Sequence, residues 1–426
     1  MARVLVISTN GFSKVNCNKT YESIFKNFKK EKLFSLFFRP HDSNIDYDFC
    51  SSYYAVSEAS IINKLIHPQS TCGGIVNKPT TTLSQELQKD TSHKYYSFFK
   101  GLDTIKRIRL LRDFLWKTNT WFNDDLKAWL RDVDADIIFY HDPGNIGYLH
   151  AMKKISDYLN IPIVYYITDD YYRFYTETVT DRLYQRLVFP KCKEIINRAS
   201  KCYCIGEMMA KEYNMLFGRE FSVIMNSTLI LPISIKTNIP KNISYFGGLH
   251  LDRWKMIARF AEIFDGEVNV YTTSEMTREI EKTFAERNVK YRGGVSGDKL
   301  TEAMQRSDAL LHIESDEKKY MTRTKLAVST KIPEYMASGR VIIGYGNPDL
   351  ASMEIISSNN AGLVIDSREE VDKSRMTIKE NLNVRNIDLW VTNAFNYVKD
   401  HFDENVVSKK FHNDIEEIIA HESTKN

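Results

Sequence analysis

Short apolar segments that end in turns and alternate with helix-like stretches recur along this 426-residue chain, and they constrain its fold more than any other feature. The first covers residues 4–7 and ends in a turn at Gly11; others cover 136–140, 162–167, 201–205 and 222–225. Continuous apolar runs separated by helices are typical of buried parallel strands. The helix before the strand at 201–205 is expected to be interrupted at Pro190, which cannot donate a helical hydrogen bond. The first half is therefore predicted to be a doubly wound α/β sheet.

The alternation restarts after residues 231–243, where Pro232 and Pro240 are separated by polar residues. We interpret this stretch as an interdomain linker. Six further strands are predicted at 244–246, 267–271, 289–292, 309–313, 341–343 and 362–365. We therefore expect two Rossmann-like domains, 1–230 and 241–402, and a C-terminal amphipathic helix, 403–426, that could pack back on the N-terminal domain. In such sheets ligands bind beyond the carboxyl ends of the strands, and we expect the site to lie in a cleft between the domains.

Composition excludes several classes of protein. The net charge of +3 gives no argument for nucleic-acid binding. The six cysteines are scattered, and only Cys202 and Cys204 are close, so buried reduced thiols are favoured over disulfides or zinc. No apolar stretch approaches the length of a membrane span, and the N-terminus is predicted to be a strand rather than a signal peptide. These features predict a cytoplasmic protein.

The segment from Lys94 to Lys117 differs from its surroundings, because lysines and arginines are interleaved with tyrosine, phenylalanine and tryptophan. A basic aromatic helix of this kind can bind an anionic membrane surface, which would place the protein at the inner face of the membrane. Ordinary amphipathic packing with a solvated basic face explains much of the same pattern. Both interpretations remain open at this stage.

The segment from Lys325 to Gly344 has the composition of an anion site. Ser329, Thr330 and Lys331 form a basic, hydroxyl-rich turn before a short helix that carries Glu334. A helix N-terminus and a lysine favour phosphate, and a carboxylate in the first turn can accept the hydroxyls of a ribose. Lys325 is a further candidate for a phosphate contact. The alternative is an ordinary loop–helix corner whose Glu334 is solvated.

Three other turns are predicted to gather beside this segment. Gly11 ends the first strand, His141 ends the strand at 136–140, and Gly247-Gly248 precedes Arg253 at the start of a helix. A guanidinium there can grip a diphosphate with two parallel hydrogen bonds. With Lys325 or Lys331 it could neutralise a diphosphate without a metal, and no Asp-x-Asp lies where a metal would be needed. Structural roles remain alternatives for these residues, a plain turn for Gly11 and a salt bridge for Arg253.

Several of these segments resemble those of the retaining glycosyltransferases of family 4 (glycosyltransferases group 1), which have the GT-B fold of two Rossmann-like domains. STKIPEYMASG is similar to the family segment whose glutamate holds the ribose of the nucleotide, which corresponds to Glu334. YFGGLHLDRW is similar to the phosphate-binding loop and places Arg253 at the donor phosphate. The turn at His141-Asp142-Pro143 resembles the segment whose histidine lies by the transferred sugar. The first strand and its Gly11 turn resemble the loop at the donor diphosphate.

The resemblance implies a hexosyltransferase-type enzyme that moves a sugar from a nucleoside-diphosphate sugar to a glycan or lipid-linked acceptor, with retention and without a metal or other cofactor. The expected context is bacterial surface polysaccharide synthesis. His141, Arg253 and Lys331 are the expected catalytic residues. The expected donor site comprises Gly11, Gly248, Arg253, Lys325, Ser329, Thr330, Lys331 and Glu334, and Asp142, Asp169 and Glu314 are expected to orient the acceptor or sugar.

The sequence departs from the family at Leu326, eight residues before Glu334, where many members have a glutamate that contacts the donor sugar. Sugar recognition must then be done by other groups, and Glu314 is one candidate. Two alternative functions stay open. The chain could be a catalytically silent glycosyltransferase-like partner subunit, or a nucleotide-sugar 2-epimerase, which shares the two-domain architecture.

Overall fold

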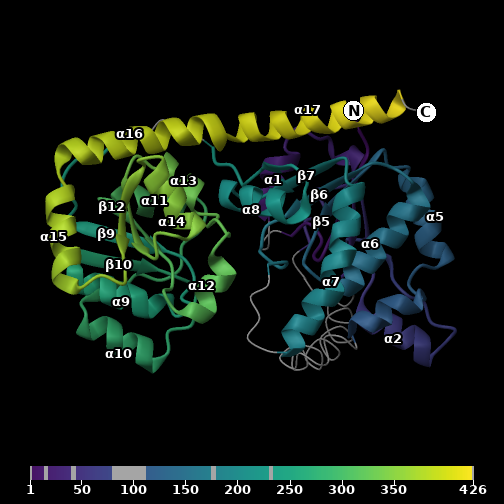
Figure 1. Ribbon diagram of the computed structural model, residues 1–426, viewed down its shortest axis with the longest axis horizontal. Coiled ribbons are helices and arrows are strands. Elements are labelled where there is room, and N and C mark those ends of the chain that lie inside the picture. The colour runs from purple at the N-terminus through teal and green to yellow at the C-terminus, as the bar shows by residue number, and fades with distance from the viewer. Residues whose placement is uncertain are drawn as a thin grey trace. The chain divides into compact units, whose positions relative to one another are not determined.

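The computed structural model describes residues 2–13, 18–39, 45–78, 112–173, 179–229 and 234–424, which form two units (Figure 1). Unit 1 comprises residues 1–224 together with 408–426, and unit 2 comprises residues 225–407. Each unit is built on its own sheet. The predicted α/β class with two Rossmann-like bodies is confirmed.

The described residues of unit 1 form an eight-stranded sheet in the order β4-β3-β2-β1-β5-β6-β7-β8. Neighbouring strands are parallel except for β3 and β4. Because β1 lies between β2 and β5, the strand order reverses there, and ligands bind at the carboxyl ends of strands at such a point. The strands are β1 (Val4–Ser8), β2 (Leu33–Phe37), β3 (Ser52–Ala55), β4 (Gly74–Ile75), β5 (Ile137–His141), β6 (Ile163–Ile167), β7 (Lys201–Cys204) and β8 (Phe221–Val223).

Side-chain caps fix the starts of several helices in unit 1. Ser57 forms a capping box with Ser60, and the Asn145 side chain accepts a hydrogen bond from the Tyr148 amide at the start of the helix after β5. The described helices are α1 (Asn18–Phe25), α2 (Glu58–Ile66), α5 (Asp124–Val133), α6 (Ile146–Leu159), α7 (Val179–Arg198) and α8 (Glu207–Phe217), with 3-10 turns at Lys30–Lys32 and Trp116–Thr118.

The predicted interruption at Pro190 is wrong, because α7 continues through this residue. Val188, Cys192 and Ile195 on the same helix are buried, and α7 packs along α6. Burial of this face offsets the single hydrogen bond that proline cannot donate.

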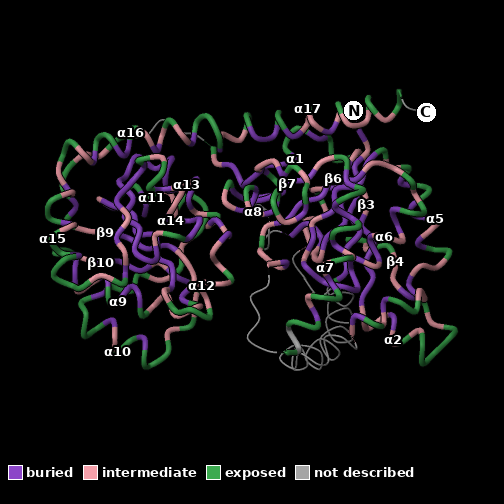
Figure 2. The backbone as a smooth tube through the Cα atoms, viewed as in Figure 1, coloured by how far each residue is buried: buried purple, intermediate pink, exposed green. Residues whose placement is uncertain are grey.

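An aromatic cluster joins the C-terminal helix, α17 (Glu404–Ser423), to the sheet of unit 1. Phe139 on β5 lies 5.2 Å from Phe25 on α1 and 5.6 Å from Phe411 on α17, measured between ring centroids. The Tyr203 hydroxyl donates to the Asp414 carboxylate. The end of α17 thus packs with unit 1, and Figure 2 shows the buried strands that it covers.

The described residues of unit 2 form a six-stranded parallel sheet in the order β11-β10-β9-β12-β13-β14. The strands are β9 (Asn242–Phe246), β10 (Glu267–Tyr271), β11 (Val289–Tyr291), β12 (Ala309–Ile313), β13 (Val341–Gly346) and β14 (Gly362–Asp366). The helices are α9 (Arg253–Ile263), α10 (Arg278–Glu286), α11 (Asp298–Arg306), α12 (Lys318–Thr324), α13 (Ile332–Ala337), α14 (Ala351–Ser358), α15 (Val371–Asn381) and α16 (Val384–His401).

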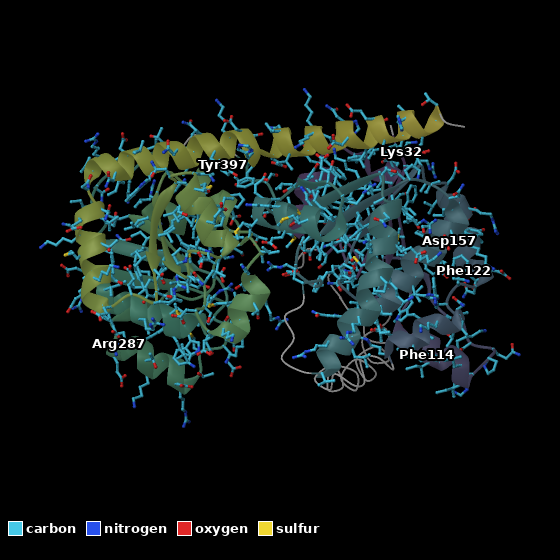
Figure 3. The ribbon with its side chains drawn as sticks, viewed as in Figure 1. Lys32, Phe114, Phe122, Asp157, Arg287 and Tyr397 are labelled. Carbon is cyan, nitrogen blue, oxygen red and sulfur yellow. The ribbon has the colours of Figure 1, made fainter. Side chains whose placement is uncertain are left out.

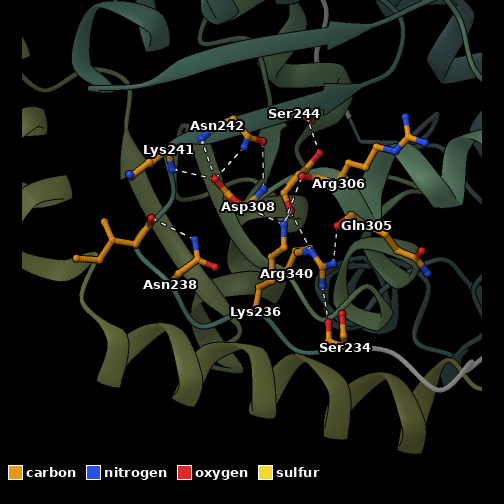
Figure 4. A network of polar contacts seen from close by, with 12 residues as sticks. Ser234, Lys236, Asn238, Lys241, Asn242, Ser244, Gln305, Arg306, Asp308 and Arg340 are labelled. Atoms are coloured by element: carbon orange, nitrogen blue, oxygen red, sulfur yellow. Dashed lines mark hydrogen bonds and ion pairs between the residues drawn. The ribbon is translucent and has the colours of Figure 1, made fainter.

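A buried arginine anchors the chain between α13 and β13 (Figure 4). The Arg340 side chain donates to the carbonyl oxygens of Ser307 at 3.0 Å and of Ser234 and Gln305 at 2.6 Å. The adjacent Lys236 amide donates to the Gly339 carbonyl. The described part of the predicted linker is therefore bound to unit 2, and β9 begins at Asn242 inside it.

Residues 94–111 of the predicted membrane-binding segment lie outside the described residues. In the remainder, Trp116 is fully buried against Phe38 and Tyr148, whereas Phe114 is 58% exposed (Figure 3). Within the described ranges no helix has both the length and the apolar character that a membrane span requires.

Candidate functional site

A cavity of about 280 Å³ opens in unit 2 where β9 and β12 end. It brings together residues from three separate parts of the sequence: the turn after β9, the end of β12 and the turn before α13. Six residues that the sequence predicted as site residues line it, namely Gly248, Arg253, Glu314, Ser329, Thr330 and Lys331. The carboxyl ends of the strands therefore do form a pocket, as the topology predicts.

Arg253 is the first residue of α9 and forms an ion pair within this cavity. Its Nη2 lies 3.0 Å from Oε2 of Glu314, and Glu314 is only 4% exposed. Burial raises the pKa of Glu314, and the nearby Arg253 charge opposes that rise. Glu314 thus contacts the predicted phosphate-binding arginine in the structure.

The two glycines after β9 allow side chains to lie close to the backbone. A Cβ added to Gly247 would lie 2.8 Å from the Tyr245 hydroxyl and 3.3 Å from Cε of Lys331. A Cβ on Gly248 would lie 2.5 Å from Nδ1 of His250. Glycine at position 247 therefore leaves room for the Tyr245 hydroxyl, with the aliphatic part of Lys331 close beside the same turn.

The hydroxyl-rich turn is held by hydrogen bonds from other parts of unit 2. The Ser329 amide donates to Oγ of Ser352 at 2.9 Å, and the Asn226 side chain donates to the Thr330 carbonyl at 2.8 Å. Lys331 precedes α13, which has only six residues. The lysine charge, rather than a long helix dipole, is thus the main feature of this turn that favours an anion.

Lys325 and Glu334 are absent from the lining of the cavity. The Lys325 carbonyl accepts a hydrogen bond from the Ala351 amide, and the next residue, Leu326, is completely buried. Glu334 is half-buried in the first turn of α13. The position at which many family members have a sugar-binding glutamate therefore belongs to the hydrophobic interior in this chain.

His312 also lines the cavity, although the sequence analysis did not single it out. It is 5% exposed at the end of β12, and its Nε2 lies 3.6 Å from Oε1 of Glu314. Burial, together with the charges of Arg253 and Lys331, lowers the pKa of His312 to about 3. A polar residue within the apolar run of β12 was the signal that could have identified it.

A second cavity, of about 440 Å³, opens in unit 1 at the carboxyl ends of β5 and β6. His141 lines it: the Tyr21 hydroxyl lies 2.7 Å from Nδ1 and the Thr168 hydroxyl 3.1 Å from Nε2. Burial lowers the pKa of His141 to about 4, so the imidazole is neutral at pH 7. Both ring nitrogens are engaged by protein hydroxyls, and the ring carries no charge.

The two aspartates predicted for this region differ in exposure. Asp142 is 1% exposed and accepts hydrogen bonds from the hydroxyls of Tyr165 and Tyr172, each at 2.5 Å, and from the Gly144 amide at 2.9 Å. Asp169 is exposed, lines the cavity and accepts from the Tyr171 hydroxyl. Asp142 therefore holds the turn together, whereas the surface of Asp169 is open to a ligand.

Gly11 is buried beside the Phe37 ring and is absent from the lining of this cavity, to which Thr9 and Asn10 contribute. Arg39 and Arg112 also line it, and the sequence analysis did not predict them as site residues. Arg39 follows β2, and Arg112 belongs to the basic aromatic segment predicted to contact a membrane, so only the tertiary structure brings them beside His141. Among the described residues no group of three or more His, Cys, Asp or Glu side chains is arranged to hold a metal ion.

Two family models match successive parts of the chain. The model for Glycosyltransferase Family 4 matches residues 84–227, and the model for the C-terminal domain of glucosyltransferase 3-like proteins matches residues 243–393. No curated protein matches the chain closely enough in sequence to count as a relative.

Solved structures with the same fold cover nearly the whole chain. Sucrose-phosphate synthase from Thermosynechococcus elongatus is similar with a TM-score of 0.64 and 11% identity, over 99% of this chain and 100% of the other. Anabaena Alr3699/HepE in complex with UDP has a TM-score of 0.62 and 11% identity, over 97% and 100%. WaaG, a glycosyltransferase involved in lipopolysaccharide biosynthesis, has a TM-score of 0.52 and 12% identity, over 96% and 98%.

The class of protein is defined by two observations. The chain has two Rossmann-like units, each with a cavity at its strand ends, and two glycosyltransferase family models match successive parts of it. This chain is a glycosyltransferase of the GT-B fold.

Proposed function

We propose that this glycosyltransferase moves a sugar from a nucleoside-diphosphate donor to a hydroxyl group of a glycan or lipid-linked acceptor, with retention of the anomeric configuration. The observation that carries the proposal is the cavity in unit 2, in which Arg253 and Lys331 both lie beside the Gly247-Gly248 turn. Two cations next to a glycine turn that lines the cavity are complementary to a diphosphate. Anabaena Alr3699/HepE, solved with UDP-glucose, supports a uridine nucleotide as the first donor to test.

In the proposed reaction the acceptor oxygen bonds to the anomeric carbon on the face from which the diphosphate departs. The bond between that carbon and the phosphate oxygen breaks, and its electron pair stays with the diphosphate. The acceptor proton moves to a phosphate oxygen. Arg253 and Lys331 stabilise the charge that develops on the diphosphate, and we propose that they suffice without a metal ion or other cofactor.

The cavity of unit 1 is the proposed acceptor site. The exposed carboxylate of Asp169 can accept a sugar hydroxyl, and His141 can bind another if that hydroxyl takes the place of Thr168 at Nε2, while Tyr21 holds Nδ1. We propose Glu334 as the ligand of the donor ribose. Lys325 and Gly11, which like Glu334 line neither cavity, are proposed as outer contacts to the donor.

The proposed context is the synthesis of a bacterial surface polysaccharide or glycolipid, and the similarity to WaaG, which is involved in lipopolysaccharide biosynthesis, supports it. The proposed location is the cytoplasmic side of the membrane. Residues 94–117 would contribute the membrane contact through side chains such as the exposed Phe114, since Trp116 is buried and Arg112 lines the cavity of unit 1. Flotation with liposomes tests that contact: binding should increase with the fraction of anionic lipid, and binding that is insensitive to lipid charge contradicts it.

The decisive experiment incubates the protein with a panel of nucleotide sugars, with and without added glycan acceptors and with EDTA present throughout. Slow release of free sugar, or its transfer with retained configuration, supports the proposal. Donor binding without turnover in any acceptor mixture identifies a silent partner subunit. Conversion of one nucleotide sugar into another identifies a 2-epimerase.

A further inference from the structure

His312 occupies a position in the donor cavity at which a purely structural residue would be apolar. On β12, Ala309, Leu311 and Ile313 belong to the hydrophobic core of unit 2, and strand alternation directs His312 to the opposite face. Its side chain is 5% exposed and lines the cavity of about 280 Å³.

Nε2 of His312 is buried and has no hydrogen-bond partner among the described residues. Its contact with Oε1 of Glu314, at 3.6 Å, is longer than a hydrogen bond. Nε of Arg253, which lines the same cavity, is likewise buried and unpartnered in the described part of the chain. Buried polar atoms in folded proteins nearly always have partners, so two unpaired nitrogens in one cavity indicate a ligand that supplies acceptors.

The charges around the cavity specify the chemistry of that ligand. Arg253 and Lys331 act on the imidazole as cations, and Glu314 is engaged by Arg253 at 3.0 Å. The imidazole is neutral in this surrounding and its N–H is a hydrogen-bond donor. Groups rich in anionic oxygen, such as a diphosphate, are complementary to two cations and an adjacent N–H donor.

We propose that His312 binds the diphosphate of the nucleotide-sugar donor through Nε2 and is a third protein contact to the leaving group, beside Arg253 and Lys331. This inference rests on the proposed function and extends it by naming a residue that positions the diphosphate. The hydrogen bond strengthens as the phosphate oxygen gains charge, so its removal lowers kcat as well as donor affinity.

The test compares two substitutions of similar size. His312→Gln places an amide N–H near the position of Nε2, whereas His312→Phe keeps a ring but has no donor. Calorimetric titration with UDP and with inorganic pyrophosphate should show about tenfold weaker binding of both ligands by His312→Phe. His312→Gln should stay within about threefold of the wild type. Melting temperatures establish that each variant is folded.

Unchanged affinity and unchanged kcat in folded His312→Phe would overturn the inference. If that variant does not fold, histidine-selective ¹⁵N labelling of the wild type decides, with the His312 signal assigned from the His312→Gln spectrum. A shift of the Nε2 resonance on addition of pyrophosphate supports the contact, and an unchanged resonance at saturation contradicts it. Failure of the wild type to bind any nucleoside diphosphate would instead contradict the proposed function itself.

Discussion

Nη2 of Arg253 and Oε2 of Glu314 lie 3.0 Å apart inside the cavity at the ends of β9 and β12. The pair holds the guanidinium beside the Gly247-Gly248 turn and links a residue at the start of α9 to one just after β12. From the sequence, separate roles are expected for these two residues, the arginine at the donor phosphate and the glutamate at the acceptor or sugar. Because the two side chains contact each other, single and double substitutions of the pair can separate its effect on the stability of unit 2 from its effect on turnover.

Removal of one partner should destabilise unit 2 more than removal of both. Glu314→Leu leaves a mostly buried guanidinium unpaired and should lower the free energy of unfolding by about 3 kcal/mol. Arg253→Met combined with Glu314→Leu should regain most of that loss but stay at least about a hundredfold below wild-type turnover. Urea denaturation and donor hydrolysis measure the two quantities. Additive losses of stability, or an active double variant, would contradict the assignment.

Two lysines that are close in the sequence should differ in their effect on the donor. Lys331→Met should weaken binding of a nucleoside diphosphate about tenfold, because this side chain lines the cavity and supplies a charge-assisted contact. Lys325→Met is the matched control, since Lys325 does not line the cavity and should change affinity less than about twofold. Calorimetric titration compares them. Equal losses would show that the diphosphate lies nearer α12 than we propose.

Glu334→Ala should separate nucleoside binding from phosphate binding. If Glu334 accepts the ribose hydroxyls, the variant should bind UDP about tenfold more weakly than the wild type and pyrophosphate equally well. If Glu334 instead has a general structural role, the variant should bind both UDP and pyrophosphate more weakly. Unchanged affinity for UDP removes Glu334 from the ribose site.

Acidification should lower stability through His312. Its pKa is about 3 in the fold against an ordinary value of 6.5, so the unfolded chain binds a proton between these values and the folded chain does not. The free energy of unfolding therefore rises with pH between about 3 and 6.5, and it decreases as the pH falls below 6.5. The loss attributable to this residue is about 2 kcal/mol at pH 5. Urea denaturation at pH 7 and pH 5 should show a smaller difference for His312→Gln, whereas His67→Gln, at an exposed position, should match the wild type.

Two glycines with nearly the same backbone conformation should respond differently to alanine. Gly144 has φ of +65°, and an added Cβ would lie 2.3 Å from the Tyr171 ring; Gly218 has φ of +66° with nothing within 4 Å. Gly218→Ala should cost about 1 kcal/mol from backbone strain alone. Gly144→Ala should cost at least about 1 kcal/mol more, because Tyr171 must move, and acceptor turnover should fall with it. Equal unfolding free energies would mean that Tyr171 is not fixed by this contact.

The repeated strands and helices follow from local patterns of residues along the chain. Apolar runs at 4–7, 136–140 and 309–313 became β1, β5 and β12 within one or two residues, because a strand buried on both faces needs a continuous apolar run. Helix starts and glycine turns likewise depend on residues that are adjacent in the sequence. The start of α9 at Arg253 and the turn before α13 could therefore be predicted. The helix interruption expected at Pro190 is absent because the packing of α7 on α6 stabilises the helix, and this packing is not a local property of the sequence.

Which side chains share a cavity depends on contacts between segments that are distant in the sequence. Leu326 lies in the interior, Lys325 lies outside the lining, and Glu314 is paired with Arg253, although all three are close in the sequence to predicted site residues. His312 enters a cavity from a predicted core strand, and Arg112 enters one from the segment predicted to contact a membrane. The physical reason is that strand periodicity specifies which face a residue occupies, whereas the register between strands and the packing of helices determine what it contacts.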